Sequence, residues 1–329
     1  MSTKKIIAIV GATGTQGSSV VHTFLDLPNW HVRALTRSPT SEKAQTLAAK
    51  GAEVIQADLN DLDSLSRAFK DAHAIFLNTD FWEPFRAALA SGKDSETACK
   101  IGYDTEVTNG KNAISAAANV PTLERFIYSA LGPMNRASGG KYPHSHHWET
   151  KAFLVDYIND QEKELAAKTS FIYIGAYLLN QFLYPKPRKE SGGAYAMVMP
   201  ASKQMRMPII DTARSTGPFV RALIEDETPR TKLLAYDEYL TIEQVIEVWE
   251  KVTGKKAAFV QMGLQELHAM SGVPLEVLYG PAFVDEFGYC GGIDGVIEPA
   301  QLKAKVNVKT FEESIRGLDM DFLLGLQGK

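Results

Sequence analysis

The chain has 329 residues, of which 45% are hydrophobic and 22% charged, and its formal net charge at pH 7 is -4. This balance excludes a disordered or fibrous chain, and the length suits one large domain with a smaller lobe. The net charge gives no sign of a basic face for direct nucleic-acid binding, and no apolar run is long enough to span a membrane. We therefore expect a cytoplasmic or nuclear protein. The two cysteines, Cys99 and Cys290, lie far apart in the sequence and predict neither a disulfide framework nor a zinc site.

Short apolar runs follow one another along the first 180 residues, separated by amphipathic segments with helical spacing. Continuous apolar runs are typical of strands buried on both faces of a parallel sheet, and the helical spacers supply the crossovers. We therefore predict an α/β fold with a doubly wound parallel-sheet Rossmann domain. The predicted strands are 5–10, 31–35, 52–57, 74–78, 125–129 and 170–175.

The regular alternation of strands and helices ends near residue 180. We assign residues 1–180 to the Rossmann domain, which about 205–255 completes, and residues 181–204 and 256–329 to a smaller α+β C-terminal lobe. Within 205–255, a capping box at Thr241 predicts the start of a helix, and the helix is expected to end before Gly254. Residues 81–106 are too long and mixed for a minimal strand-to-helix connection and predict an elaboration beside the nucleotide crevice. Residues 132–146 predict a loop rich in Gly, Pro and Ser.

A glycine-rich turn joins the first predicted strand to the first helix. Such a turn lets backbone N–H groups approach a pyrophosphate, which the positive end of the helix dipole stabilises. The spacing is GxxGxxG and not the simplest GxGxxG, and its place at the start of a βαβ series favours nucleotide binding over a purely structural turn. The predicted phosphate loop consists of Gly11, Ala12, Thr13, Gly14, Thr15, Gln16 and Gly17.

The end of the second predicted strand indicates which dinucleotide binds. An acidic residue there would accept a hydrogen bond from a ribose 2′-hydroxyl, but this chain has Arg37 followed by Ser38. A guanidinium suits a 2′-phosphate, so we predict NADP(H); the alternative is an arginine on a solvated loop. After the third strand, Asp58 and Leu59 are expected near the adenine. After the fourth, Asn78 and Thr79 are expected near the ribose and nicotinamide.

Together these motifs resemble the NmrA-like family of atypical short-chain dehydrogenases. The similar segments are VGATGTQGSSV, the strand-and-arginine segment that begins VRALTR, NTDFWE (78–83), HWETK (147–151) and AYLLNQF (176–182). The resemblance implies that Asp80, Phe81, Lys151, Tyr177 and Asn180 contact the cofactor. For several members it also implies a regulatory role, in which the protein senses the dinucleotide and binds a protein partner such as a transcription factor.

The same resemblance locates a candidate catalytic set. A typical short-chain dehydrogenase uses a Tyr and a Lys spaced YxxxK on one helix face, with a Ser at the end of a preceding strand. Here Lys151 and Ser129 match, but His147 stands in place of the tyrosine. Histidine is a competent proton donor, although a neighbouring ammonium opposes its charging. Tyr142 in the preceding loop is an alternative proton donor.

The tract HSHHW raises the question of a metal site. Three histidines in one loop, His144, His146 and His147, rarely supply a complete ligand set, and no cysteine or acidic residue lies at a supporting spacing in the sequence. We therefore expect no metal.

Two functional hypotheses follow, since the dinucleotide site is complete and the proton-transfer site is not. The first is an NADP(H)-binding redox sensor or regulator with little turnover. The second is an NADPH-dependent oxidoreductase that reduces a small apolar carbonyl or enone. A third hypothesis, a Rossmann scaffold without a nucleotide, predicts no stabilisation by NADPH.

Overall fold

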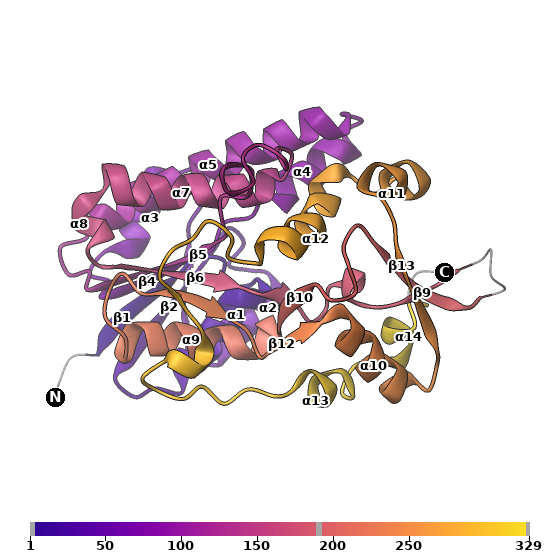
Figure 1. Cartoon of the computed structure of the whole chain (residues 1–329). Helices are drawn as coiled ribbons and strands as arrows, with labels where there is room; N and C mark the ends of the chain where they lie inside the picture. Colours follow the sequence, from indigo (N-terminus) through magenta and orange to yellow (C-terminus); the bar gives the residue numbers. More distant parts are fainter. Residues whose placement is uncertain (1–3, 189–192, 327–329) are drawn as a thin grey trace.

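The computed structural model describes residues 4–188 and 193–326. Its centre is an eight-stranded sheet of order β14-β11-β6-β5-β4-β1-β2-β3, in which every pairing is parallel (Figure 1). The sheet therefore confirms the predicted doubly wound α/β fold. Its strands are β1 (Lys5–Ile9), β2 (Trp30–Thr36), β3 (Glu53–Gln56), β4 (Ala74–Leu77), β5 (Arg125–Ala130), β6 (Thr169–Ile174), β11 (Lys232–Ala235) and β14 (Val296–Ile297).

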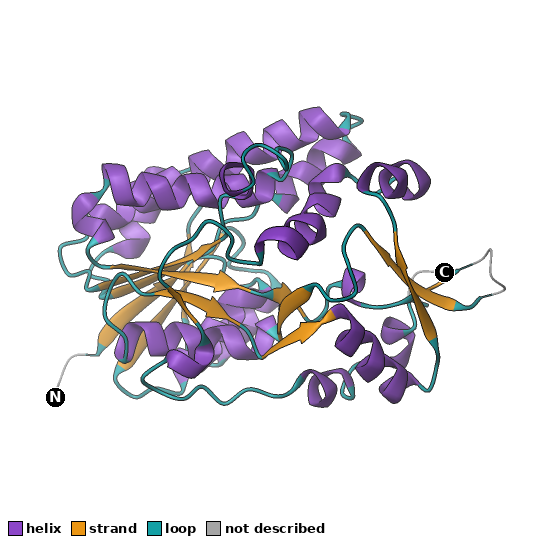
Figure 2. Cartoon of the chain, in the orientation of Figure 1, coloured by secondary structure: helices purple, strands orange, loops and turns teal. Residues whose placement is uncertain are grey.

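Helices cover both faces of this sheet (Figure 2). The amphipathic segment after the first strand packs as expected, because Val20, Val21 and Phe24 are fully buried against the sheet. One face carries α1 (Thr15–Leu25), α2 (Glu42–Ala49) and α9 (Thr212–Glu225). The other carries α3 (Leu62–Phe69), α5 (Ser95–Ala118), α7 (His146–Gln161) and α8 (Lys163–Ala166). Among the described residues, no helix has the length and apolar character needed to cross a membrane.

Most of the remaining elements form a smaller lobe, while α4 lies in the segment 81–106 and α6 in the segment 132–146. Two three-stranded sheets build the lobe, with orders β12-β10-β7 and β13-β9-β8. Their strands are β7 (Ala176–Tyr177), β8 (Lys186–Pro187), β9 (Tyr195–Met199), β10 (Arg206–Ile210), β12 (Glu238–Thr241) and β13 (Ala257–Gln261). The other helices are α4 (Trp82–Ala90), α6 (Met134–Ala137), η1 (Gln181–Leu183), α10 (Ile242–Thr253), α11 (Leu264–Ser271), α12 (Leu275–Phe287), η3 (Pro299–Gln301), α13 (Phe311–Ile315) and α14 (Met320–Leu323).

The two parts of the chain interleave more than the predicted boundaries describe. Within 205–255, α9 and β11 belong to the large domain, whereas β10, β12 and α10 belong to the lobe. Within 256–329, β14 adds an edge strand to the central sheet. The predicted capping box is present, with Thr241 and Gln244 bonded reciprocally and Gly254 in the left-handed conformation at the helix end.

Candidate functional site

The phosphate loop joins β1 to α1 at the carboxyl-terminal edge of the sheet. Gly14 is the N-cap residue of α1 and offers no side chain to cap it, so the first N–H groups of the helix have no side-chain partner there. A Cβ on Gly17 would stand 2.2 Å from the carbonyl oxygen of Gly11, so only glycine lets the helix approach the loop this closely. This cradle fits the pyrophosphate of a dinucleotide.

Gln16 connects this loop to Tyr177, the last residue of β7. Its Nε2 donates to the Tyr177 hydroxyl at 2.6 Å, while its buried Oε1 has no hydrogen-bond partner among the described residues. Asn180, three residues further, is exposed, and its side-chain oxygen accepts the Phe182 backbone N–H. The two residues expected to contact the cofactor therefore lie on one segment beside the loop, with Tyr177 bonded directly to it.

Arg37 lies at the end of β2 but is already engaged. Its Nη2 donates to both carboxylate oxygens of Glu83, at 2.7 and 2.8 Å, and this hydrogen bond raises the pKa of Arg37. Both side chains are more than half exposed. Ser38 is exposed beside them. A bound 2′-phosphate would therefore compete with the Glu83 carboxylate for the guanidinium.

The predicted adenine and ribose contacts follow β3 and β4. Asp58 accepts the backbone N–H of Asn60 and is half-buried, as is Leu59. The backbone carbonyl of Asn78 faces Gly11, the first glycine of the phosphate loop. The parallel register of β1 with β2 and β4 brings these segments to one edge of the sheet, as expected.

The residues after Asn78 differ in exposure. Thr79 is buried, and Asp80 is exposed and accepts the backbone N–H of Trp82 at the start of α4. Phe81 is 1% exposed and packs in a separate apolar cluster with Phe85 and Cys99. The structure thus places the Phe81 side chain in the protein interior.

Lys151 is held in a buried ion pair. Its Nζ donates to Glu106 Oε1 at 2.9 Å and to the carbonyl and hydroxyl oxygens of Thr79 at 3.0 and 3.1 Å. Thr79 and Thr150 donate their hydroxyls to the same carboxylate. The Glu106 side chain is fully buried and that of Lys151 is 12% exposed, so each charge compensates the other.

His147 lies one turn before Lys151 on α7, as the spacing predicts. Its ring contacts Trp82 and Phe81, with centroids 4.8 and 6.0 Å away. Its Nδ1 lies 2.5 Å from Oε1 of Glu276, a residue of α12 in the C-terminal lobe. Ser129 is buried near the end of β5, as expected.

Glu276 is the centre of a group of hydrogen bonds at the start of α7. Its two oxygens accept the backbone N–H groups of His146 and His147, each at 2.8 Å, and both imidazole Nδ1 atoms. Burial alone would raise its pKa, but the hydrogen bonds from His146 and His147 hold the pKa of Glu276 down to about 2. The bond to Glu276 in turn raises the pKa of His146.

The fold supplies the cysteine and carboxylate that the sequence spacing lacked near the histidines. Donor atoms of Cys99, His146 and Glu276 lie within 4.8 Å of one another, so the fold brings a thiol and a carboxylate to His146 that the sequence spacing did not indicate. Hydrogen bonds account for the group as it stands, since the Cys99 thiol lies 3.7 Å from Glu276 and burial raises its pKa to about 12. His144 stacks on Tyr279 instead.

Tyr142 packs away from this group. Its hydroxyl donates to Glu286 at 2.6 Å, and its ring contacts Tyr279 and Phe283 of the C-terminal lobe. With 5% of its surface exposed, Tyr142 is a packing residue.

Sequence reasoning missed three carboxylates: Glu83, Glu106 and Glu276. A signal existed for Glu106, because it continues the spacing of Cys99, Gly102 and Gly110 along the buried face of α5. The other two depend on contacts between distant segments.

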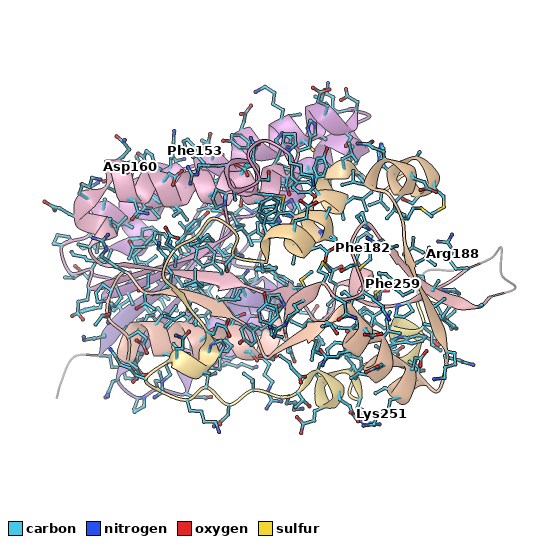
Figure 3. All side chains as sticks on the ribbon, in the orientation of Figure 1. Phe153, Asp160, Phe182, Arg188, Lys251 and Phe259 are labelled. Carbon is cyan, nitrogen blue, oxygen red and sulfur yellow. The ribbon has the colours of Figure 1, made fainter. Side chains whose placement is uncertain are left out.

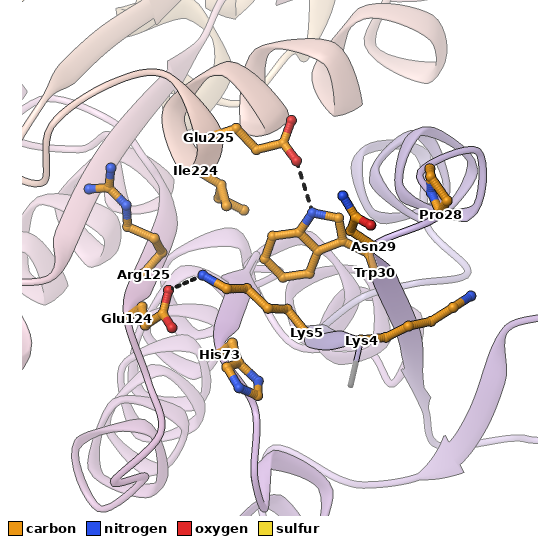
Figure 4. A pocket seen from close by; sticks show the side chains of 10 residues that line it. All are labelled: Lys4, Lys5, Pro28, Asn29, Trp30, His73, Glu124, Arg125, Ile224 and Glu225. Atoms are coloured by element: carbon orange, nitrogen blue, oxygen red, sulfur yellow. Dashed lines mark hydrogen bonds and ion pairs between the residues drawn. The ribbon is translucent and has the colours of Figure 1, made fainter. Parts of the chain in front are cut away.

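A cavity of about 640 Å³ lies at the opposite, amino-terminal edge of the sheet (Figure 4). It is lined by the first residues of three strands, Lys5 of β1, Trp30 of β2 and Arg125 of β5. Lys5 pairs there with Glu124, and the Trp30 indole donates to Glu225. This cavity is separate from the predicted site.

The NmrA-like family model matches residues 3–315. The chain belongs to the NmrA-like family. Among its relatives, the NmrA-like oxidoreductase malD of Malbranchea aurantiaca is 26% identical, over 79% of this chain and 76% of the relative. The oxidoreductase ptmS of Penicillium ochrochloron is 28% identical, over 78% and 76%.

Solved structures share the fold of this NmrA-like chain. The crystal structure of NmrA, a negative transcriptional regulator, in complex with NADP has a TM-score of 0.70 and 20% identity, covering 100% of this chain and 99% of that chain. The NADPH-dependent quinone oxidoreductase QOR2 of Escherichia coli, complexed with NADPH, has a TM-score of 0.65 and 21% identity, covering 94% and 98%. At these identities the likeness shows the fold alone.

Proposed function

We propose that this NmrA-like protein is an NADPH-dependent oxidoreductase that reduces a small apolar carbonyl or enone. The observation that carries the proposal is the arrangement of α7, which places His147 one turn from Lys151 beside the segment that follows β4. The relatives malD and ptmS, both named oxidoreductases, support the same class of function.

NADPH fits the cradle made by the uncapped start of α1, the close approach at Gly17 and the unpartnered Gln16 oxygen. When bound there, it supplies the hydride. Arg37 would hold the 2′-phosphate in place of Glu83, and Lys151 would bind the ribose. His147 holds a proton that it donates to the oxygen of the acceptor.

The preference for an apolar acceptor rests on residues 177–182, which begin at the end of β7. Tyr177, Leu179 and Phe182 expose 39%, 54% and 54% of their surfaces, and Tyr177 is bonded to the phosphate loop (Figure 3 labels Phe182). Exposed apolar side chains on a segment that is bonded to the phosphate loop through Tyr177 favour an apolar ligand.

Turnover tests the proposal directly. We expect purified protein to oxidise NADPH when given members of a panel of small enones, ketones and quinones. Lys151→Ala should abolish the reaction and His147→Phe should slow it about 10²-fold or more, since general acid catalysis contributes about 10²–10⁴-fold. Equal rates in the wild type and both variants would contradict the proposal.

The alternative is a regulator that binds NADP(H) and a protein partner. The full-length likeness of the fold to NmrA favours it. Tight NADP(H) binding without oxidation by any acceptor in the panel would favour this role over the enzyme.

A further inference from the structure

We propose that Glu276 is a positioning residue that sets the tautomer of His147 and fixes the orientation of its ring for proton donation. The inference rests on the proposed reductase function and assigns a role to a residue of the C-terminal lobe, 129 positions from the histidine that it contacts.

The hydrogen bonds determine which ring nitrogen carries the proton. An ionised carboxylate only accepts, so the Nδ1 of His147 must be the donor in its contact with Glu276 Oε1. In the neutral imidazole, Nε2 is then the acceptor. Among the described residues, no protein group forms a hydrogen bond with Nε2, which leaves this atom for the substrate.

This tautomer matches the chemistry. With NADPH bound to supply the hydride to the acceptor carbon, the proton on Nε2 of the imidazolium would pass to the acceptor oxygen. The product imidazole keeps its proton on Nδ1, where Glu276 already accepts it. The carboxylate stays ionised throughout, and solvent later returns a proton to Nε2.

Glu276 is rigid enough to hold the ring. Its side chain is 1% exposed, and it also accepts the backbone N–H groups of His146 and His147 at 2.8 Å. These bonds fix the carboxylate relative to the same helix turn that carries the imidazole. Its negative charge also offsets the repulsion between an imidazolium and the nearby Lys151 ammonium, whose own charge Glu106 compensates.

The test compares two glutamates of the same helix. Glu276→Gln should lower kcat about 10²-fold, while the Kd for NADPH changes less than threefold. Glu286→Gln is the matched control, because this carboxylate also projects from α12 but contacts the loop residues Lys141 and Tyr142. Its kcat should stay within twofold of wild type. Circular dichroism and the Kd for NADPH establish that each variant is folded.

A double-mutant cycle separates positioning from a structural role. In a His147→Phe background, Glu276→Gln should change kcat less than threefold, because its target is gone. An undiminished loss in that background would overturn the inference.

Imidazole NMR provides a readout that does not depend on turnover. The wild type should show a strongly hydrogen-bonded Nδ1–H for His147, assigned by its absence in His147→Phe. Glu276→Gln should shift this signal upfield, because a neutral amide oxygen accepts a weaker bond, while Glu286→Gln leaves it unchanged. If no acceptor is reduced, the proposed function fails, while this signal still decides the tautomer. An unchanged signal in Glu276→Gln would overturn the inference whatever the activity.

Discussion

Replacing Glu106 by glutamine removes one charge from the buried pair that holds Lys151. The two charged atoms lie 2.9 Å apart, and the carboxylate is fully buried. At an effective dielectric constant of about 20, their attraction is about 6 kcal/mol, which the cost of removing both charges from water offsets in part. Losing one partner leaves the other uncompensated, so Glu106→Gln should lower the free energy of unfolding by about 3–5 kcal/mol.

Urea unfolding of the cofactor-free protein measures this loss. The double variant Glu106→Gln with Lys151→Met should recover most of the stability, because neither charge then remains buried. Glu124→Gln, which breaks an exposed ion pair with Lys5, is the control and should cost less than about 1 kcal/mol. Strictly additive losses in the double variant would refute the reasoning, since they would mean that the two charges do not interact.

Three further predictions test other parts of the molecule. Arg37→Asp should raise the Kd for NADPH at least tenfold with little change for NADH, and Glu83→Gln should lower the Kd for NADPH, both by calorimetric titration; the reverse order for Arg37→Asp would contradict the cofactor assignment. Gly217→Ala should lower Tm, because a Cβ there would meet a threonine oxygen of α1 at 2.1 Å, whereas Gly280→Ala, with open space around it, should leave Tm unchanged or raise it. The stabilisation from Glu276 should be lost as pH falls below 4.5 towards its folded pKa of about 2. The stabilisation from His146, whose folded pKa is raised above 6.5, should be lost as pH rises through that folded pKa. Glu276→Gln should therefore lower the urea midpoint most between about pH 4.5 and 6.5, and a uniform loss at all pH values would exclude this linkage.

The sheet could be predicted closely because its first six strands are short apolar runs, and the first five of them are each followed by a helical segment. Strand β5 was expected at 125–129 and spans Arg125–Ala130. The two-residue strand β14 could not be predicted, because its pairing with β11 depends on where the chain returns to the sheet. Short edge strands carry too little local pattern to be recognised.

The sequence predicted the parts of the site that depend on local spacing, and it did not predict the contacts between distant segments. Local spacing was enough to place His147 and Lys151 on one helix face and the glycines at the start of α1. It could not indicate that Arg37 meets Glu83, since the two residues lie on different elements 46 positions apart. Ion pairs between distant segments follow from the tertiary fold and leave no periodic signal in the sequence.

In the sequence, Lys151 follows His147 by four residues, and its ammonium is the objection to His147 as a proton donor. The objection assumes two positive charges on one helix face without compensation. In the folded protein a buried carboxylate lies beside each of them: Glu106 pairs with Lys151, and Glu276 bonds both His147 and His146. The first comes from α5 and the second from the C-terminal lobe. The proposed positioning of the His147 ring therefore requires the C-terminal lobe to be docked on α7, because only then does Glu276 accept its Nδ1–H.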